Sequence, residues 1–152
     1  DSGWTEVTDA LKQSDYLLSC VLSGDADTVA SCIDKVHEQN TSVLRYNDEN
    51  SLACVLSLAF YTARAHYQML RELPAGRGFA DILLVPNRNA DYPAIVLELK
   101  YDKDAETAIS QIKRQNYGGA LKEYFGEVVL VGINYDKSDK RHSCVIERIT
   151  KK

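Results

Sequence analysis

The chain has 152 residues, the length of one ordinary domain, and can bury enough surface to fold without a metal or disulfide staple. Hydrophobic residues make up 45% of it and charged residues 26%, as in water-soluble globular proteins, and no apolar run approaches the roughly 18 residues of a membrane span. We therefore expect a cytoplasmic protein without a membrane segment. Neither a signal peptide nor a natural start is visible, which is compatible with a piece of a longer protein.

The net charge of −4 argues against a strongly basic, unspecific binder of nucleic acids. The charge is unevenly distributed, however. Residues 1–99 hold 7 Lys and Arg against 14 Asp and Glu, whereas residues 100–152 hold 11 against 8. The basic residues thus gather in the part of the chain where a phosphate backbone would lie if the site derived below exists.

Cysteines and histidines show no metal-binding pattern. The four cysteines are Cys20, Cys32, Cys54 and Cys144, and the three histidines are His37, His66 and His142. No CxxC pair occurs, and three of the cysteines lie in apolar helical stretches, so we expect buried, reduced thiols. The histidines lack ligand spacing and are expected at the surface or on helices.

Two helices are predicted at the start of the chain. Apolar residues recur at helical spacing over residues 6–22, and Gly24 is a natural helix stop. A second helix follows, with Asp25 or Asp27 as its cap. Both belong to an N-terminal helical extension, residues 1–45, in which we find no chemistry.

The next segment changes from helical to extended periodicity. A long, largely buried helix is predicted from Asn47 or Asp48 to Tyr67. Three apolar runs follow that are typical of strands, at residues 67–73, 79–85 and 93–101, the last of them a central strand.

The remaining elements complete a mixed sheet. A helix is predicted from Ala105 to Ile112, with a break at Gly118 and Gly119, and two strands follow at residues 128–133 and 143–149. The order after the extension is α-β-β-β-α-β-β, a mixed α/β fold in a single structural domain whose core spans residues 46–152.

The central apolar run contains two charged residues. Period-two alternation places Glu98 and Lys100 on one face, about 7 Å apart along the strand, while Leu97 and Leu99 point the other way. Opposite charges on a mostly buried strand cost desolvation energy unless they pair or bind a ligand, and the ends of such strands are where open sheets bind ligands. A salt-bridged pair at a strand end is the alternative interpretation.

Asp81 follows the Gly-Arg-Gly segment 76–78 at the start of the preceding strand. If the two strands form a hairpin, its turn lies at residues 86–92, and antiparallel pairing brings Asp81 to the same end as Glu98 and Lys100. Two carboxylates then converge with one ammonium group, and such oxygen ligands are those that Mg²⁺ prefers. An Asp after a Gly-rich turn is also common for structural reasons.

These residues predict phosphodiester hydrolysis. A divalent ion held by Asp81, Glu98 and the Leu99 carbonyl would polarise a phosphodiester and lower the pKa of a bound water. Lys100 would orient that water or stabilise the oxyanion. Glu49, in the first turn of the third helix, faces the core side and could reach the metal or its water, although the helix dipole also favours a glutamate there.

Three segments resemble a known family. They are residues 76–81 (GRGFAD), 95–100 (IVLELK) and 108–112 (AISQI) followed by Tyr117. They resemble the PD-(D/E)XK nuclease superfamily, most closely its branch often fused behind an AAA-ATPase-like domain in bacterial proteins, and the similarity covers about residues 46–149. The D…ExK spacing alone is weak evidence, whereas its combination with the strand order and the Gln-Ile helix is specific.

The resemblance implies a restriction-endonuclease-like αβββαβ core with an N-terminal helical extension, and it assigns roles to individual residues. The catalytic residues that it implies are Glu49, Asp81, Glu98, Lys100 and Gln111. The metal, Mg²⁺ or Mn²⁺, would be bound by Asp81, Glu98 and the Leu99 carbonyl, with Glu49 acting through water. Gln111 is also compatible with an exposed helix position.

The implied substrate is nucleic acid, DNA more than RNA, and the residues expected to contact it are Arg77, Lys113, Arg114 and Tyr117. A fused or partner AAA-ATPase and a homodimer suited to double-strand cleavage are further expectations. Two alternatives stay open: a catalytically inactive nuclease-fold module that binds nucleic acid or protein for an ATPase, and hydrolysis of another phosphorylated substrate.

Overall fold

The computed structural model describes residues 2–40, 56–57, 59–71, 82–88, 91–115 and 126–151. In chain order the elements are α1 (Ser2–Ser23), α2 (Ala26–Asn40), the 3-10 helix η1 (Tyr61–Ala65), β1 (Tyr67–Arg71), β2 (Ile82–Pro86), β3 (Ala94–Tyr101), α4 (Ala105–Gln115), β4 (Gly126–Asp136) and β5 (Arg141–Lys151). The mixed α/β class is confirmed, with two N-terminal helices, five strands and a helix between the third and the fourth strand. The boundary drawn at residue 45 stays a prediction.

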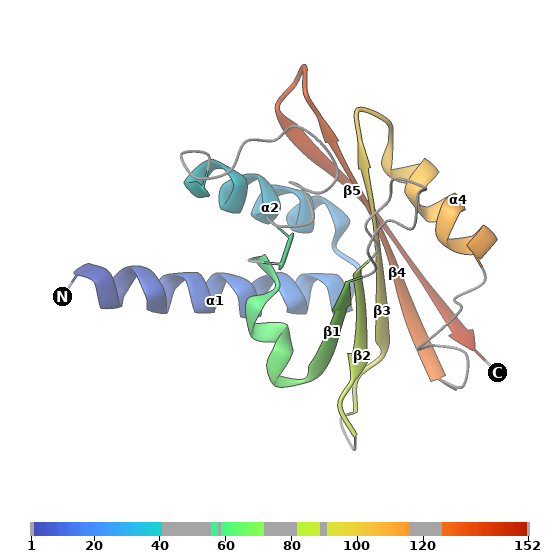
Figure 1. The fold of residues 1–152 in the computed structure, drawn as a ribbon, viewed down its shortest axis with the longest axis horizontal. Coiled ribbons are helices and arrows are strands. Elements are labelled where there is room, and N and C mark those ends of the chain that lie inside the picture. The colour runs from blue at the N-terminus through green and yellow to red at the C-terminus, as the bar shows by residue number, and fades with distance from the viewer. Residues whose placement is uncertain are drawn as a thin grey trace.

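The five strands form one sheet in the order β1-β2-β3-β4-β5, with β3 in the centre (Figure 1). Neighbouring strands are antiparallel except β3 and β4, which run parallel over eight residue pairs from Ala94 and Val128 to Tyr101 and Tyr135. A parallel pair needs a crossover connection, and α4 lies in that connection. The Glu98 and Lys100 strand is therefore enclosed by neighbours on both sides.

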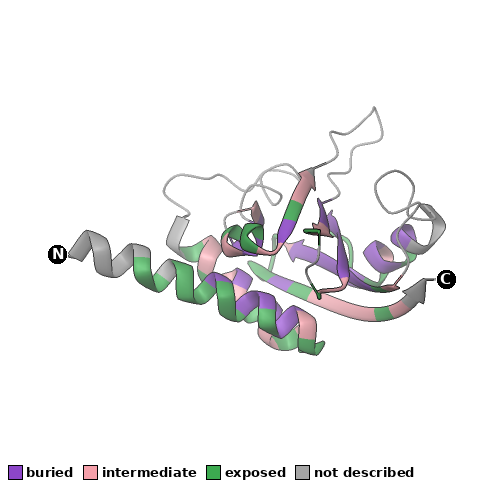
Figure 2. Ribbon diagram, turned by 90° about the horizontal axis from the view of Figure 1, so that it is seen from below, coloured by how far each residue is buried: buried purple, intermediate pink, exposed green. Residues whose placement is uncertain are grey.

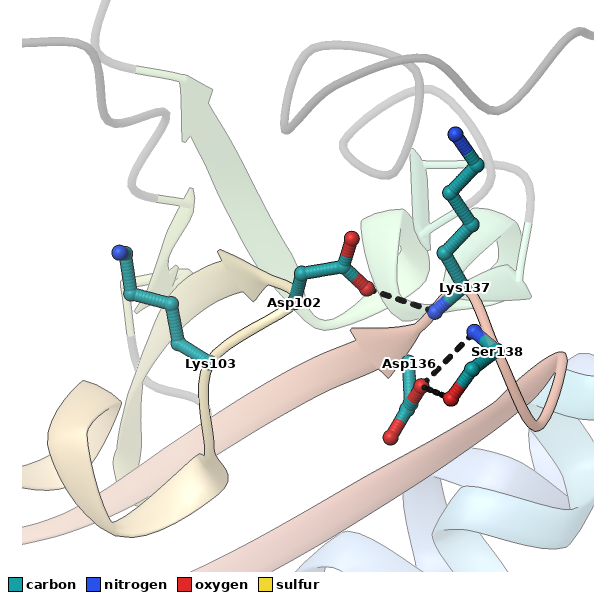
Figure 3. A pocket seen from close by; sticks show the side chains of 5 residues that line it. All are labelled: Asp102, Lys103, Asp136, Lys137 and Ser138. Carbon is teal, nitrogen blue, oxygen red and sulfur yellow. Dashed lines mark hydrogen bonds between the residues drawn. The ribbon is translucent and has the colours of Figure 1, made fainter.

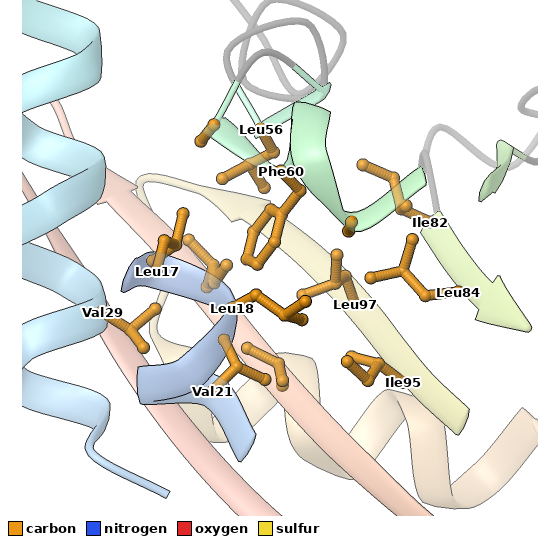
Figure 4. Close-up of a cluster of buried hydrophobic side chains, with 14 of the residues drawn as sticks. Leu17, Leu18, Val21, Val29, Leu56, Phe60, Ile82, Leu84, Ile95 and Leu97 are labelled. Atoms are coloured by element: carbon orange, nitrogen blue, oxygen red, sulfur yellow. The ribbon is translucent and has the colours of Figure 1, made fainter. Parts of the chain in front are cut away.

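The sheet is covered on both faces. The helices α1 and α2 lie on one face and α4 lies on the other (Figure 1). On the first face, Leu17, Leu18 and Val21 of α1 pack with Ile95 and Leu97 of β3 (Figure 4). Figure 2 shows that the buried part of α1 is its second half, where the helix reaches the sheet. Burial of this apolar surface is the main force that holds the helices on the sheet.

The junction between α1 and α2 follows local rules. Gly24 adopts φ +80, a left-handed conformation that glycine reaches without a steric penalty. Of the two predicted caps it is Asp25 that acts, because its carboxylate accepts hydrogen bonds from the backbone N–H of Thr28 at 3.3 Å and from the Thr28 hydroxyl at 2.6 Å. The chain therefore turns sharply and returns α2 along the sheet.

The predicted third helix is wrong at its end. Its start lies outside the described residues, and the part within them passes from a helical segment at Leu56 into η1 and then into β1 at Tyr67. Leu56, Phe60 and Ala63 are buried as expected, but a stripe of buried residues does not show where an α-helix ends and a 3-10 turn begins. Tyr67 is buried too, but it is the first residue of β1 and not part of a helix. Its hydroxyl donates a hydrogen bond to the Pro93 carbonyl at 2.7 Å.

The expected surface or helical position of His142 is also wrong. This residue lies in β5 with no exposed side-chain surface, and Asp34 Oδ1 on α2 contacts both its Nδ1 at 2.6 Å and its backbone N–H at 2.8 Å. The rings of His37 and Tyr135 lie 5.6 Å and 4.9 Å from its ring. We call Asp34, His37, Tyr135 and His142 the His142 cluster, and it ties α2 to β4 and β5.

The described cysteines are free, as expected. Cys20 is buried, and Cys32 and Cys144 are partly buried. Burial raises the pKa of the Cys144 thiol to about 12, so this group stays protonated at neutral pH. Cys54 lies outside the described residues.

Within the described ranges, no helix combines the length and the apolar character needed to cross a membrane.

Candidate active site

The central strand presents two charged side chains to the face that α4 covers. Leu97 and Leu99 belong to the core on the α1 side, so the alternation of β3 turns Glu98 and Lys100 toward α4. The exposed fraction of the surface is 0% for Glu98 and 2% for Lys100, so both charged groups are almost completely shielded from water. The predicted sharing of one face is confirmed.

Gln111 is the side chain on α4 that meets this pair. Ala108 and Ile112 of α4 are buried, and Gln111, three residues after Ala108, lies on the same side of the helix and is 8% exposed. Its Oε1 accepts a hydrogen bond from the Lys100 ammonium. The contact fixes the end of a flexible side chain, and it argues against an exposed surface position for Gln111.

The Glu98 carboxylate accepts no hydrogen bond from any residue that the structure describes. Neither Oε1 nor Oε2 has a hydrogen-bond partner among the described residues, although both atoms are buried. A buried charge without partners is costly, and such an atom in a folded protein indicates a missing ligand or a functional strain. Two inward-facing carboxylate oxygens fit a hard divalent cation, which binds oxygen ligands.

The neighbouring strand β4 contributes two further residues on this face, Gly132 and Asn134. The parallel register pairs Glu98 with Gly132 and Lys100 with Asn134. A Cβ atom at Gly132 would lie 2.5 Å from the Ala105 carbonyl oxygen, so only glycine lets the first turn of α4 lie this close to β4.

Asn134 is 3% exposed and acts on the loop after β3. Its Oδ1 accepts a hydrogen bond from the Lys103 backbone N–H at 2.9 Å. Neither Gly132 nor Asn134 was predicted from the sequence as a residue of the site. A signal existed for each, because a lone Gly and a lone Asn interrupt an otherwise apolar strand.

The β2 side of the site is described up to Ile82, which pairs with Leu97 in the antiparallel register. The predicted residues Glu49, Arg77, Asp81 and Tyr117 lie outside the described residues, and the side chains of Lys113 and Arg114 on α4 are not described. Within the described part of the chain, no three His, Cys, Asp or Glu side chains form a metal-binding group. Of the predicted set, the structure brings Lys100 into contact with Gln111, and Glu98 and Leu99 precede Lys100 on β3.

A pocket opens where the parallel strands β3 and β4 end. It has a volume of about 510 Å³ and is lined by Asp102, Lys103, Asp136, Lys137 and Ser138 (Figure 3). We call it the strand-end pocket. It begins two residues beyond Lys100, at the place where open sheets commonly bind ligands.

Comparison with known proteins connects the chain to a family. No curated protein matches the sequence. A family model described as the PD-(D/E)XK nuclease superfamily matches residues 47–144, well over half of the chain, and this range includes β3 with Glu98 and Lys100 and α4 with Gln111. The chain belongs to the PD-(D/E)XK nuclease superfamily.

Proposed function

We propose that this chain is a metal-dependent nuclease that hydrolyses phosphodiester bonds of nucleic acids, DNA rather than RNA. The observation that carries the proposal is the fully buried Glu98 carboxylate, which lacks a hydrogen-bond partner among the described residues and shares a strand face with Lys100. A protein keeps such a costly group when a ligand satisfies it. Membership of a nuclease superfamily supports a phosphodiester as the substrate.

The proposed metal ligands are Asp81, Glu98 and the Leu99 carbonyl, and the metal is Mg²⁺ or Mn²⁺. Ile82, the residue after Asp81, pairs with Leu97, the residue before Glu98. The two acidic residues thus flank a directly paired position of neighbouring strands. Carboxylate oxygens are the ligands that a hard divalent cation prefers.

The direction of the peptide groups supports the Leu99 carbonyl as the third ligand. The Asp102 N–H donates to the Tyr135 carbonyl of β4 at 2.8 Å. Successive residues of a strand direct their backbone groups to alternate sides, so the carbonyl of Leu99, three residues earlier, faces the β2 side. The strand β2 directly follows Asp81 in the chain.

The remaining residues would act on the water and on the phosphate. Bound metal supplies Lewis-acid polarisation of the phosphodiester and lowers the pKa of a water ligand. The Lys100 ammonium, held by Gln111, would orient the attacking water or neutralise charge that develops on phosphate oxygens. Glu49 would hold a water at the edge of the site.

Contacts with the substrate and with partner proteins belong to the same proposal. Arg77, Lys113, Arg114 and Tyr117 would contact the nucleic acid. A fused or partner AAA-ATPase would suit the family branch that the three sequence segments resemble, and a homodimer would suit double-strand cleavage.

The test is a cleavage assay on plasmid, single-stranded DNA and RNA with Mg²⁺, Mn²⁺ or a chelator. Glu98→Ala and Lys100→Ala should each abolish metal-dependent cutting, because one removes a metal ligand and the other removes the cation beside it. Glu127→Ala is the control, since Glu127 pairs with Arg148 on the exposed surface of β4 and β5.

Two outcomes would contradict the proposal. Cleavage that survives both substitutions would come from another site or another protein. A purified chain that binds nucleic acid yet cuts none of the three substrates with either metal would instead be the inactive nuclease-fold module.

A further inference from the structure

The two acidic residues of the strand-end pocket form hydrogen bonds with the loops that line it. The Asp102 carboxylate accepts a hydrogen bond from the Lys137 backbone N–H at 2.7 Å, which joins the loop after β3 to the loop after β4. Asp136 Oδ1 accepts from the N–H of Ser138 at 2.9 Å and from its hydroxyl at 2.7 Å. These hydrogen bonds lower the pKa of Asp136, so its carboxylate is ionised and bound within its own turn.

The backbone at Asp102, in the lining of the pocket, has an unusual conformation. Asp102 has φ 54, a left-handed conformation that residues other than glycine seldom adopt. The chain therefore bends at Asp102, directly after the last residue of β3. Such backbone strain persists where the surrounding contacts hold it, and the contact to Lys137 does so here.

The basic residues of the pocket are differently placed. Lys103 and Lys137 are exposed, and neither ammonium forms an ion pair with a described residue. Figure 3 shows the Lys103 and Lys137 side chains on either side of Asp102, both rising toward the top of the view. The carboxylates are engaged by backbone donors, whereas the ammonium groups stand at the free ends of long stems, so an approaching polyanion meets the ammonium groups first.

The pocket is coupled to the candidate active site. Asn134, the register partner of Lys100, accepts the hydrogen bond of the Lys103 N–H. Lys103 is three residues beyond Lys100, so their Cα atoms lie at most about 11 Å apart. A nucleic-acid strand carries a phosphate at about every 3.4 Å of its axis, so a strand cut at Lys100 would place neighbouring phosphates over this pocket.

We propose that the strand-end pocket is a phosphate subsite in which Lys103 and Lys137 bind the backbone of the nucleic-acid strand next to the scissile bond. The inference rests on the proposed nuclease function and adds the residues that position the substrate. The contacts are to phosphate, so they contribute affinity and register but no sequence preference.

The test measures binding rather than cleavage. The affinity of a short fluorescent DNA duplex and of a single strand is followed by anisotropy in chelator, between about 50 and 200 mM salt. Lys103→Ala combined with Lys137→Ala should weaken duplex binding about 10-fold at low salt and reduce the slope of log affinity against log salt by about 1.8 for two lost contacts. The matched control combines Lys12→Ala with Lys35→Ala, which removes the same charge from exposed positions on α1 and α2.

A substitution of opposite sign adds a second test. Asp102→Asn keeps an oxygen acceptor for the Lys137 N–H and removes a negative charge, so it should tighten binding. Equal weakening by the two double substitutions would mean that net charge alone matters and would overturn the subsite. The subsite would also be overturned if the unsubstituted chain bound no DNA at low salt. The proposed metal-dependent cleavage is tested separately, by the cleavage assay with Glu98→Ala and Lys100→Ala.

Discussion

The ammonium of Lys100 donates a hydrogen bond to the side-chain oxygen of Gln111, and this contact joins the central strand to the helix that crosses from β3 to β4. The two residues are 11 positions apart in the chain, and both are buried. A lysine held in this way has lost most of its rotamer freedom before substrate binds. Such preorganisation is how a folded protein lowers the entropic cost of catalysis.

Gln111→Ala tests this contact. The substitution removes the acceptor and leaves a donor of Lys100 poorly satisfied, so we expect kcat for DNA cleavage to fall about 10-fold with little change in KM. The free energy of unfolding should fall by about 1–3 kcal/mol, measured in urea. Gln111→Glu keeps an oxygen acceptor and should recover most of kcat. Equal kcat values for the Ala and Glu variants would contradict a positioning role.

Glu98→Gln tests the buried carboxylate without any cleavage. In chelator the substitution should raise the thermal midpoint, because a neutral amide costs less to bury than an unpartnered charge. Added Mg²⁺ or Mn²⁺ should raise the midpoint of the unsubstituted chain and not that of Glu98→Gln, since binding to the folded state stabilises it. Glu127→Gln, at an exposed pair with Arg148, should respond to metal like the unsubstituted chain. Identical metal responses in all three proteins would exclude Glu98 as a ligand.

Gly132→Ala tests the close approach of α4 to β4. Its Cβ would lie 2.5 Å from the Ala105 carbonyl oxygen and 3.0 Å from the Ala108 Cβ, so the helix must shift. We expect a loss of about 1–3 kcal/mol in the free energy of unfolding and a fall in cleavage rate, because the same helix carries Gln111.

Gly24→Ala is the comparison for Gly132→Ala. Gly24 has φ +80 and nothing within 4 Å of an added Cβ, so the substitution should cost about 1–2 kcal/mol through backbone strain alone. It should leave the cleavage rate of the folded protein unchanged. If the two variants lose activity equally, the position of α4 is not what Gly132 protects.

The His142 cluster predicts a pH dependence of stability. Burial lowers the pKa of His142 below its usual 6.5, against the raising effect of Asp34, and burial also lowers the pKa of His37. The unfolded chain then binds more protons than the folded one, so stability present above pH 6.5 is lost as the pH falls through the lower folded pKa.

The measurement is the free energy of unfolding in urea at several pH values. His142 contributes a slope of at most about 1.4 kcal/mol per pH unit. His142→Gln should reduce the loss of stability below pH 6.5. His66 lies outside the cluster, with its ring 4.6 Å from that of Tyr92, and His66→Gln should leave this loss of stability unchanged. Unaltered pH profiles in both variants would refute the role of the cluster.

Periodicity was sufficient for most of the fold. The apolar run of β3 and its alternation predicted a central strand with Glu98 and Lys100 on one face, since a strand of period two leaves no other arrangement. The same logic failed near Tyr67, because a stripe of buried residues does not show where a helix ends, and Tyr67 is the first residue of β1.

The chain sequence by itself thus determined the element order, the nuclease-type motif and the shared face of its charged pair, because these depend on local geometry and on neighbours in the chain. Only the tertiary structure decided that Gln111 holds Lys100, that Glu98 lies without a described partner and that His142 is buried against Asp34, 108 residues away. Such contacts depend on how α2 and α4 dock on the sheet. The docking minimises the exposed apolar surface of the whole chain, a property that no single segment encodes.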